Sequence, residues 1–219
     1  MAKRARRTKQ ARARRAPGAR AGVQADRVVD AALALAAERR WREVTLADIA
    51  ARAGIETSQL HALYPSKPAV VAAFTDRVDA ASLAGPAAAD EPVRDRLLDL
   101  LMRRFDALGP HKRAVASILC DAAINPCAAM TLGPRLMRSM TRTLEAAGAG
   151  HGGLIGLARA KVLAGIYAGA LFVWLRQDDP DLARTMAHLD RQLRRAERWA
   201  ELAGRTAAFR RPEAGAAAA

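Results

Sequence analysis

A group of short polar side chains gathers between positions 57 and 61 of the chain. Its members are Thr57, Ser58, Gln59 and His61. Hydroxyl, amide and imidazole groups donate and accept hydrogen bonds, and side chains of this size can approach the edges of DNA bases without steric conflict. The apolar Ile55 and Leu60 predict a short helix whose inner side packs against the protein. The polar group then lies on the outer side of that helix, where a partner can reach it.

A second helix and a tight turn are predicted directly before the polar group. Thr45 is a favourable N-cap, and Asp48 completes a capping box, so a helix should begin at this point. Gly54 stands where a tight turn needs a residue that tolerates positive φ, and the small Ala50 lets the following helix cross close by. Two helices joined in this way form a helix-turn-helix, whose second helix enters the major groove of DNA.

The residues that follow the polar group complete a recognisable pattern. Tyr64-Pro65-Ser66-Lys67 ends one helix at a proline and starts the next under a serine cap. Together with RVVDAALALAAERRW and TLADIAARAGIETSQLHAL before it, the stretch from about Ala25 to Phe74 resembles the DNA-binding domain of TetR-family repressors. From this we expect Thr57, Ser58, Gln59 and His61 to contact bases. Contacts to phosphates are expected from Thr45, Tyr64 and Lys67.

Two positions depart from the family pattern. Arg40 stands where a glycine is usual after the first helix, so it either adopts a left-handed conformation at a cost of about 1 kcal/mol or the helix ends differently. Glu56 stands where Ser or Thr usually caps the second helix of the motif, and an anion there opposes phosphate. We expect Thr57 to take over as the cap and Trp41 to fill the bottom of the small core. A three-helix packing unit that has lost DNA binding is the alternative.

Composition predicts an all-α protein. Of the 219 residues 51% are hydrophobic, mostly Ala and Leu, and only 4% are aromatic, with no sustained period-2 run that would indicate strands. We predict an N-terminal three-helix helix-turn-helix domain followed by a C-terminal helical bundle for ligand binding and dimerisation, about nine helices in all. The predicted division is a disordered basic tail at 1–24, the DNA-binding domain at 25–74, the ligand-binding and dimerisation domain at 75–204 and a disordered tail at 205–219.

The positive charge is concentrated at the N-terminus. The formal net charge is +14, and residues 1–25 carry nine Lys or Arg and no acidic residue. Such a segment repels itself and lacks apolar periodicity, so it is expected to be disordered when free. It is either an arm that contacts phosphates or a narrow minor groove, or a solvated tail without a partner.

Several classes of function find no support in the sequence. The four histidines have neither metal-ligand spacing nor a neighbouring nucleophile motif, so we expect no enzyme, no metal and no cofactor. Cys120 and Cys127 fit reduced thiols, with a thiol sensor as the alternative. No signal peptide is found, and the apolar stretch Val162 to Leu175 is too short to span about 30 Å of hydrocarbon. We therefore expect a cytoplasmic protein with no stable membrane insertion.

The rest of the chain predicts a series of helices separated by Gly and Pro steps. They run from Lys67 to Leu83, from Pro92 to Leu108 and from Lys112 to Ile124, and Gly133-Pro134 then either kinks one helix or separates two. A helix from Leu154 to Arg176 and a last helix capped by Asp179 follow. Small or apolar residues at seam spacing predict a four-helix dimer interface of the last two helices, as the resemblance also implies. These residues are Gly165, Gly169, Leu182, Met186, Leu189 and Leu193.

The resemblance also implies a ligand cavity within the C-terminal helices. The apolar and adaptable side chains that could line it are Phe105, Cys120, Ile124, Met137, Met140, Tyr167 and Phe172. Few charges fall on these inner faces, which favours a hydrophobic small-molecule effector over an anionic metabolite. Such an effector would act by moving the helix from Lys67 to Leu83.

Sequence reasoning therefore favours a homodimeric DNA-binding transcriptional regulator, a repressor that binds a palindromic operator in double-stranded DNA and is released by its effector. A second function comes from VWLRQDDPDLARTMAHLDRQLRRAERWA, which resembles TetR-like proteins related to the lipid-binding proteins of coenzyme Q biosynthesis. This implies, as an alternative, a lipid- or quinone-binding accessory protein with a vestigial DNA-binding domain. A DNA-binding architectural protein that acts mainly through its basic tail is a third alternative.

Overall fold

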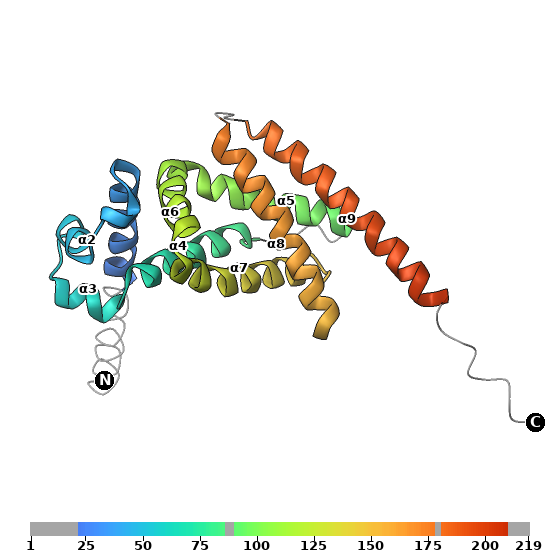
Figure 1. Cartoon of the computed structure of the whole chain (residues 1–219), viewed down its shortest axis with the longest axis horizontal. Coiled ribbons are helices and arrows are strands. Elements are labelled where there is room, and N and C mark those ends of the chain that lie inside the picture. The colour runs from blue at the N-terminus through green and yellow to red at the C-terminus, as the bar shows by residue number, and fades with distance from the viewer. Residues whose placement is uncertain (1–21, 86–89, 178–180, 210–219) are drawn as a thin grey trace, which may run out of the picture. The chain divides into compact units, whose positions relative to one another are not determined.

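The computed structural model describes residues 22–85, 90–177 and 181–209, and every regular element within these ranges is helical (Figure 1). Most of the two predicted tails lies outside the described residues. Contacts divide the chain into two compact units. The first consists of Met1–Val78 with Leu108–Arg135, and the second of Asp79–Ala107 with Leu136–Ala219.

The first unit contains the predicted helix-turn-helix. A helix over residues 22–38 is followed by the 3-10 helix η1 (Trp41–Glu43), α2 (Leu46–Ala53), α3 (Thr57–Leu63) and most of α4 (Lys67–Ser82). The 3-10 helix η2 (Gly109–His111), α6 (Lys112–Ile124) and the beginning of α7 (Pro126–Ala146) complete it. The apolar sides of these helices form one core, which includes Val28, Ala32, Leu35, Trp41, Ile49, Leu60, Val70, Phe74 and Ile118.

The end of the first helix shows how the missing glycine is accommodated. Arg40 is extended, with φ −62° and ψ 133°, so it avoids the left-handed conformation because the helix stops before it. Trp41 follows with only 6% of its surface exposed, which confirms its predicted place in the core.

Ion pairs join the first helix to its neighbours. Arg77 of α4 reaches Asp30 at 2.5 Å and Asp26 at 3.0 Å, and Arg52 of α2 makes two hydrogen bonds of 2.7 and 2.8 Å to Glu38. These contacts are largely exposed and contribute little to stability individually, but they join α2 and α4 to the first helix.

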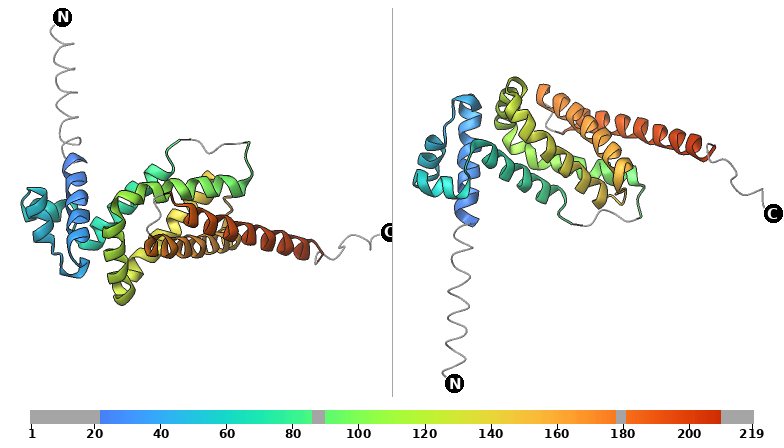
Figure 2. Two further views of the ribbon diagram at one scale, coloured as in Figure 1. Left: turned by 90° about the horizontal axis from the view of Figure 1, so that it is seen from above. Right: turned by 60° about the horizontal axis from the view of Figure 1, so that its bottom comes forward.

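The second unit is built from α5 (Val93–Leu108), the larger part of α7, α8 (Gly153–Arg176) and α9 (Ala183–Phe209). Its core centres on Phe105, whose ring lies 5.5 Å from that of Tyr167 and 5.7 Å from that of Trp174. Helices α8 and α9 run alongside each other (Figure 2). Leu189 and Leu193 of α9 are buried in this unit.

A charged cluster is buried in the second unit. Arg104 of α5 pairs with Asp79, and Ser139 of α7 donates a hydrogen bond of 2.7 Å to the same carboxylate. The guanidinium of Arg104 also lies 5.0 Å from the ring centre of Tyr167. Each charge is thus paired where water is excluded, so removal of either partner would leave an isolated buried ion.

Two expectations about the later helices are settled by their lengths. The Gly133-Pro134 step lies inside one continuous helix, α7, so it does not separate two helices. The apolar segment that was expected to be too short for a membrane is part of the 24-residue α8, which is long and apolar enough to cross one by length and composition alone. One side of α8 forms the core of the second unit, and its buried residues are Ala160, Leu163, Ala164, Tyr167, Ala170 and Trp174.

Candidate nucleic-acid interface

The start of α2 is fixed by the predicted capping box. Thr45 accepts a hydrogen bond from the backbone N–H of Asp48 at 3.1 Å, and its own N–H donates to the Asp48 carboxylate at 2.9 Å. The backbone hydrogen bond from Thr45 and the nearby Arg39 lower the pKa of Asp48. The Thr45 hydroxyl also donates to Asp48 at 2.7 Å. The side chain predicted to hold a phosphate is therefore already engaged in the cap.

The turn between α2 and α3 has the predicted geometry. Gly54 adopts the left-handed conformation, with φ 66° and ψ 42°, and its N–H donates to the carbonyl groups at the end of α2. The N–H of Ile55 donates to the carbonyl of Ala50 at 3.1 Å. This sharp reversal brings α3 against α2 without an intervening loop.

Helix α3 buries one side chain completely and exposes the polar group. Leu60 has no exposed surface. The side chains predicted to contact bases, Thr57, Ser58, Gln59 and His61, are all exposed. Since Leu60 points inward between them, the polar group forms the outer side of the helix.

The predicted cap of α3 is wrong. Thr57 is the first residue of the helix, and Glu56 occupies the N-cap position in extended conformation. The N–H of Glu56 donates to Oε1 of Gln59 at 3.4 Å, a long bond from the reverse arm of a capping box. The backbone amide of residue 56 thus has only a long, weak bond to a residue of the polar group.

Lys67 is turned inward. Its ammonium group donates to the carbonyl of Trp41 at 2.6 Å and lies 4.6 Å from the centre of the Trp41 ring. Burial lowers the pKa of Lys67, and the nearby Asp121 opposes this shift. Tyr64, the C-cap of α3, is half-buried, and burial raises its pKa. None of the three predicted phosphate contacts therefore presents an exposed polar group without a partner. The Thr45 hydroxyl is bonded within its cap, Tyr64 is half-buried, and Lys67 is bonded to Trp41.

Sequence reasoning missed Ser117. Its hydroxyl accepts a hydrogen bond of 2.9 Å from the N–H of Trp41 and donates to the carbonyl of Arg39 at 3.2 Å. We call the contacts among Lys67, Trp41 and Ser117 the Trp41 clasp, because they join the start of α4 and the middle of α6 to η1. No local signal predicts this clasp, since Trp41 and Ser117 are 76 positions apart.

The residues predicted to line one ligand pocket lie in different places. Phe105, Met140 and Tyr167 are buried in the packed core of the second unit, whereas Phe172 of α8 is 59% exposed. Cys120 is exposed and Ile124 is 67% exposed, and both belong to the first unit. Met137 of α7 is partly exposed. Helical spacing identified apolar positions correctly but did not show which of them share a cavity.

The predicted dimer-interface residues also separate into two groups. Leu189 and Leu193 are buried within the chain, and Gly169 approaches His188 of α9, so these three belong to the contact between α8 and α9 of one chain. Gly165 and Met186 are exposed, and Leu182 is partly exposed with a positive φ of 53°.

The fold and the polar face of α3 define a class, a helix-turn-helix domain joined to a helical bundle. Residues 28–74 match the family described as bacterial regulatory proteins, tetR family. The N-terminal domain is therefore a TetR-family domain. The family consists of regulatory proteins, in agreement with the prediction that the chain is not an enzyme.

Solved structures share the fold over most of the chain. A TetR transcriptional regulator from Nitrosomonas europaea ATCC 19718 is similar with a TM-score of 0.67 and 24% identity, over 79% of this chain and 97% of that one. A TetR regulator from Rhodococcus sp. RHA1 gives 0.60 and 22%, over 80% and 95%. A tetR-family regulator from Streptomyces coelicolor gives 0.59 and 18%, over 89% and 92%. No curated protein is similar in sequence at a significant level.

Proposed function

We propose that the protein is a transcriptional regulator that binds duplex DNA as a homodimer and reads bases with α3. The observation that carries this proposal is the exposed polar group on a helix anchored by the fully buried Leu60. A short helix held in this way presents its outer side as a rigid unit, which is what entry into a major groove requires.

Gln59 is the side chain best suited to direct base recognition. A side-chain amide can donate to and accept from adenine at the same time. Its bond to the Glu56 N–H is long at 3.4 Å, so a base can replace it at small cost. Thr57, Ser58 and His61 supply shorter contacts beside it.

The three residues predicted to contact phosphates have different roles in this proposal. We assign Lys67 to positioning, because its ammonium holds the Trp41 carbonyl and the start of α4 in place. Thr45 and Tyr64 lie at the two ends of the motif, and their contacts to phosphate remain part of the proposal. A direct Lys67 contact would require exchange of the Trp41 carbonyl for a phosphate oxygen.

The outer side of α8 supports a homodimer. Its exposed residues recur at helical spacing opposite the buried side, and most are apolar. They include Leu154, Ala158, Val162, Gly165, Ala168 and Phe172. This face is apolar apart from the exposed Lys161, and its length favours association with a second copy, with the small Gly165 near its centre to allow close approach. Two recognition helices would then face a palindromic operator.

Regulation by a hydrophobic effector is the remaining part of the proposal. Helix α4 belongs to the first unit up to Val78 and to the second from Asp79, so a ligand that alters the second unit can act on the DNA-binding unit through it. The effector would have to open the packed core around Phe105 and Tyr167. Loss of DNA affinity on binding would make the protein a repressor released by its ligand.

Selection of fragmented genomic DNA tests the proposal, with full-length protein and with protein lacking residues 1–22. The salt concentration should be about 0.15 M, where nonspecific attraction is reduced. A shared palindrome in both selections supports a specific regulator. Enrichment that disappears without the tail points to an architectural role. No enrichment with either protein, together with a lipid extracted in stoichiometric amount, would favour the lipid-binding alternative.

A further inference from the structure

An open hollow of about 580 Å³ lies in the first unit, away from the polar group of α3. One wall is formed by the end of the first helix and η1, including Arg40 and Trp41, and the other by one side of α6. The α6 residues on that side recur at helical spacing. They are Arg113, Ala116, Ser117, Cys120, Asp121 and Ile124. A hollow of this volume is within the range that holds small molecules.

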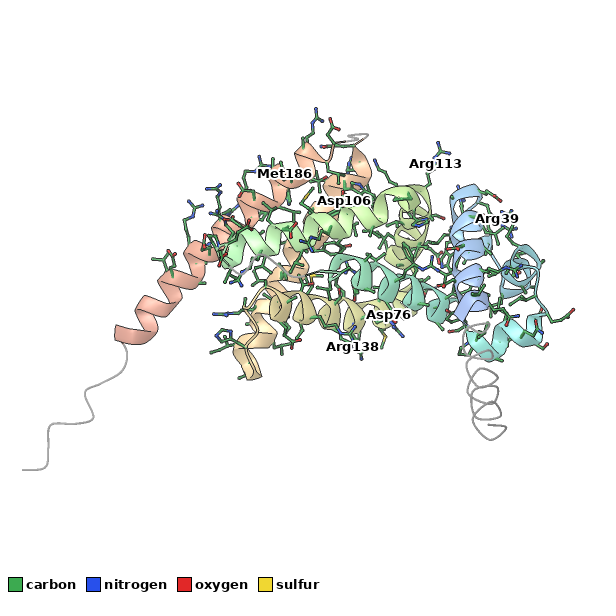
Figure 3. The ribbon with its side chains drawn as sticks, turned by 180° about the vertical axis from the view of Figure 1, so that it is seen from behind. Arg39, Asp76, Asp106, Arg113, Arg138 and Met186 are labelled. Atoms are coloured by element: carbon green, nitrogen blue, oxygen red, sulfur yellow. The ribbon has the colours of Figure 1, made fainter. Side chains whose placement is uncertain are left out.

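Two arginines that line the hollow carry uncommitted positive charge, Arg40 opposite Ser117 and Arg113 one turn before Ser117 on α6. Arg39 is paired with Asp48 at 2.7 Å, and Glu38 is paired with Arg52 at 2.7 Å. Arg40 and Arg113, in contrast, have no ion pair or hydrogen bond within the part of the chain that the structure describes. Figure 3 shows Arg113 on α6 and Arg39 on the first helix. Two guanidinium groups are thus available to an anion.

The Ile124 end of the hollow is apolar at its rim. Ile124, the last residue of α6, is 67% exposed and lines the hollow together with the buried Trp41 and Ala36. Arg113 and Ile124 are separated by three turns of helix, a distance of about 16 Å. Since Asp121 lies at the Ile124 end, an anionic group is repelled there and attracted to the Arg113 end. The two ends of the hollow therefore differ in charge, so an amphipathic ligand would bind in one orientation.

We propose that this hollow is a small-molecule site for an amphipathic organic carboxylate, bound with its carboxylate on Arg40 and Arg113 and its apolar body toward Ile124. A guanidinium binds a carboxylate through paired, charge-assisted hydrogen bonds. An aromatic or aliphatic body then extends from the two arginines along α6 toward the exposed Ile124. Cys120 and Ile124, which the sequence suggested for an effector pocket in the C-terminal helices, are two of the residues that line this separate site.

The ligand would lie against the Trp41 clasp. Trp41 and Ser117 both line the hollow, and their hydrogen bond joins η1 to α6. Where the two states of this clasp differ in DNA affinity, a carboxylate that prefers one state changes the affinity for DNA, and DNA changes the affinity for the carboxylate by the same factor. The binding site is independent of the proposed function, whereas this coupling depends on it.

Binding of 2-naphthoate to the full chain, measured by ligand-observed NMR and calorimetry, tests the site. The neutral 2-naphthamide serves as the matched ligand. The double variant Arg40→Gln with Arg113→Gln should weaken naphthoate about tenfold or more and leave naphthamide nearly unchanged. Ala116→Phe, which fills the hollow, should abolish binding of both. Arg138→Gln, which removes an exposed arginine from α7, should change neither affinity.

Three results would overturn the site. They are no naphthoate binding up to about 5 mM, binding that survives Ala116→Phe, and equal loss of affinity in the Arg138→Gln control. The coupling is tested separately by titrating DNA with and without naphthoate. A shift in DNA affinity in the wild type and none in the double arginine variant supports it. Failure of DNA binding in every sample would contradict the proposed function. The naphthoate measurements would still test the small-molecule site, because they do not require DNA.

Discussion

Helices α3 and α8 each bury one side and expose the other, but their exposed sides differ in chemistry. Helix α3 shows hydroxyl, amide and imidazole groups around a buried leucine. Helix α8 shows mainly apolar side chains, with Val162 53% and Phe172 59% exposed. The exposure of a helix side therefore does not indicate which kind of partner it binds. The polar or apolar character of its exposed side chains does.

The exposed sides of α3 and α8 also differ in their hydration. The polar groups of α3 are hydrated when no partner is present, so they remain exposed at little cost and exchange water for base edges on binding. The apolar face of α8 gains free energy only when water is removed from it. We therefore propose that α3 binds DNA, whose base sequence varies from site to site. We propose that α8 binds a second copy of the chain in a permanent contact.

The largest effect is expected from a charge placed in the apolar face of α8. Val162→Glu would bury an unpaired carboxylate between two copies, at a cost of several kcal/mol, so the dimer dissociation constant should rise about 100-fold or more. Analytical ultracentrifugation over a range of concentrations measures this change. Ala80→Glu adds the same charge at an exposed position of α4 and should leave the dimer intact. An unchanged dimer in Val162→Glu would mean that α8 does not form the interface.

Removal of one amide from the polar face of α3 should have the next largest effect. Gln59→Ala should weaken binding to the selected operator about 5- to 150-fold, because a paired contact to a base is lost. Binding to unrelated duplex should change little. Fluorescence anisotropy with both duplexes measures the two affinities, and Gln192→Ala on α9 is the control. Equal loss on both duplexes would remove Gln59 from the list of base-reading residues.

Lys67 lies close to α3 in sequence but, unlike the polar group of α3, its ammonium faces inward. Lys67→Ala should lower the free energy of unfolding by about 1–3 kcal/mol, since the hydrogen bond to Trp41 and the contact with its ring are lost. The slope of log affinity against log salt should stay nearly constant. Chemical denaturation and salt titration measure the two quantities. A slope shallower by about one unit would instead establish a phosphate contact.

The smallest effect is expected at the cap of α3. Glu56→Ser should stabilise the helix by about 0.5–1 kcal/mol, because serine is a favourable N-cap. It also removes an anion beside the predicted DNA surface, so affinity for all duplexes should rise a few-fold. Thermal unfolding and anisotropy follow the two effects. A decrease in affinity would show that the Glu56 side chain assists recognition.

Local signals predicted much of this structure. The predicted helix from Lys112 to Ile124 coincides with α6, and α4 and α5 differ from their predicted limits by one residue at a single end. The capping box at Thr45 and the left-handed Gly54 were also predicted correctly. These features depend on residues within a few positions of one another, which is the range over which caps and periodicity act.

Features that depend on distant residues could not be predicted. The Trp41 clasp and the buried pair of Asp79 and Arg104 join segments that are far apart in the chain. Helical spacing also could not tell whether Leu189 and Leu193 face a second copy or the same chain, because both kinds of contact use the same seam. The structure places these two leucines inside the chain.

The proposed function depends most on specific recognition of DNA by α3. The most direct test is the ratio of affinities for the selected operator and a scrambled duplex at about 0.15 M salt, for the wild type and for a variant with Thr57, Gln59 and His61 changed to alanine. We expect a ratio of about 1,000 or more for the wild type and a ratio near one for the variant, with scrambled-duplex affinity retained. A wild-type ratio near one, or a ratio that the variant preserves, would contradict the account.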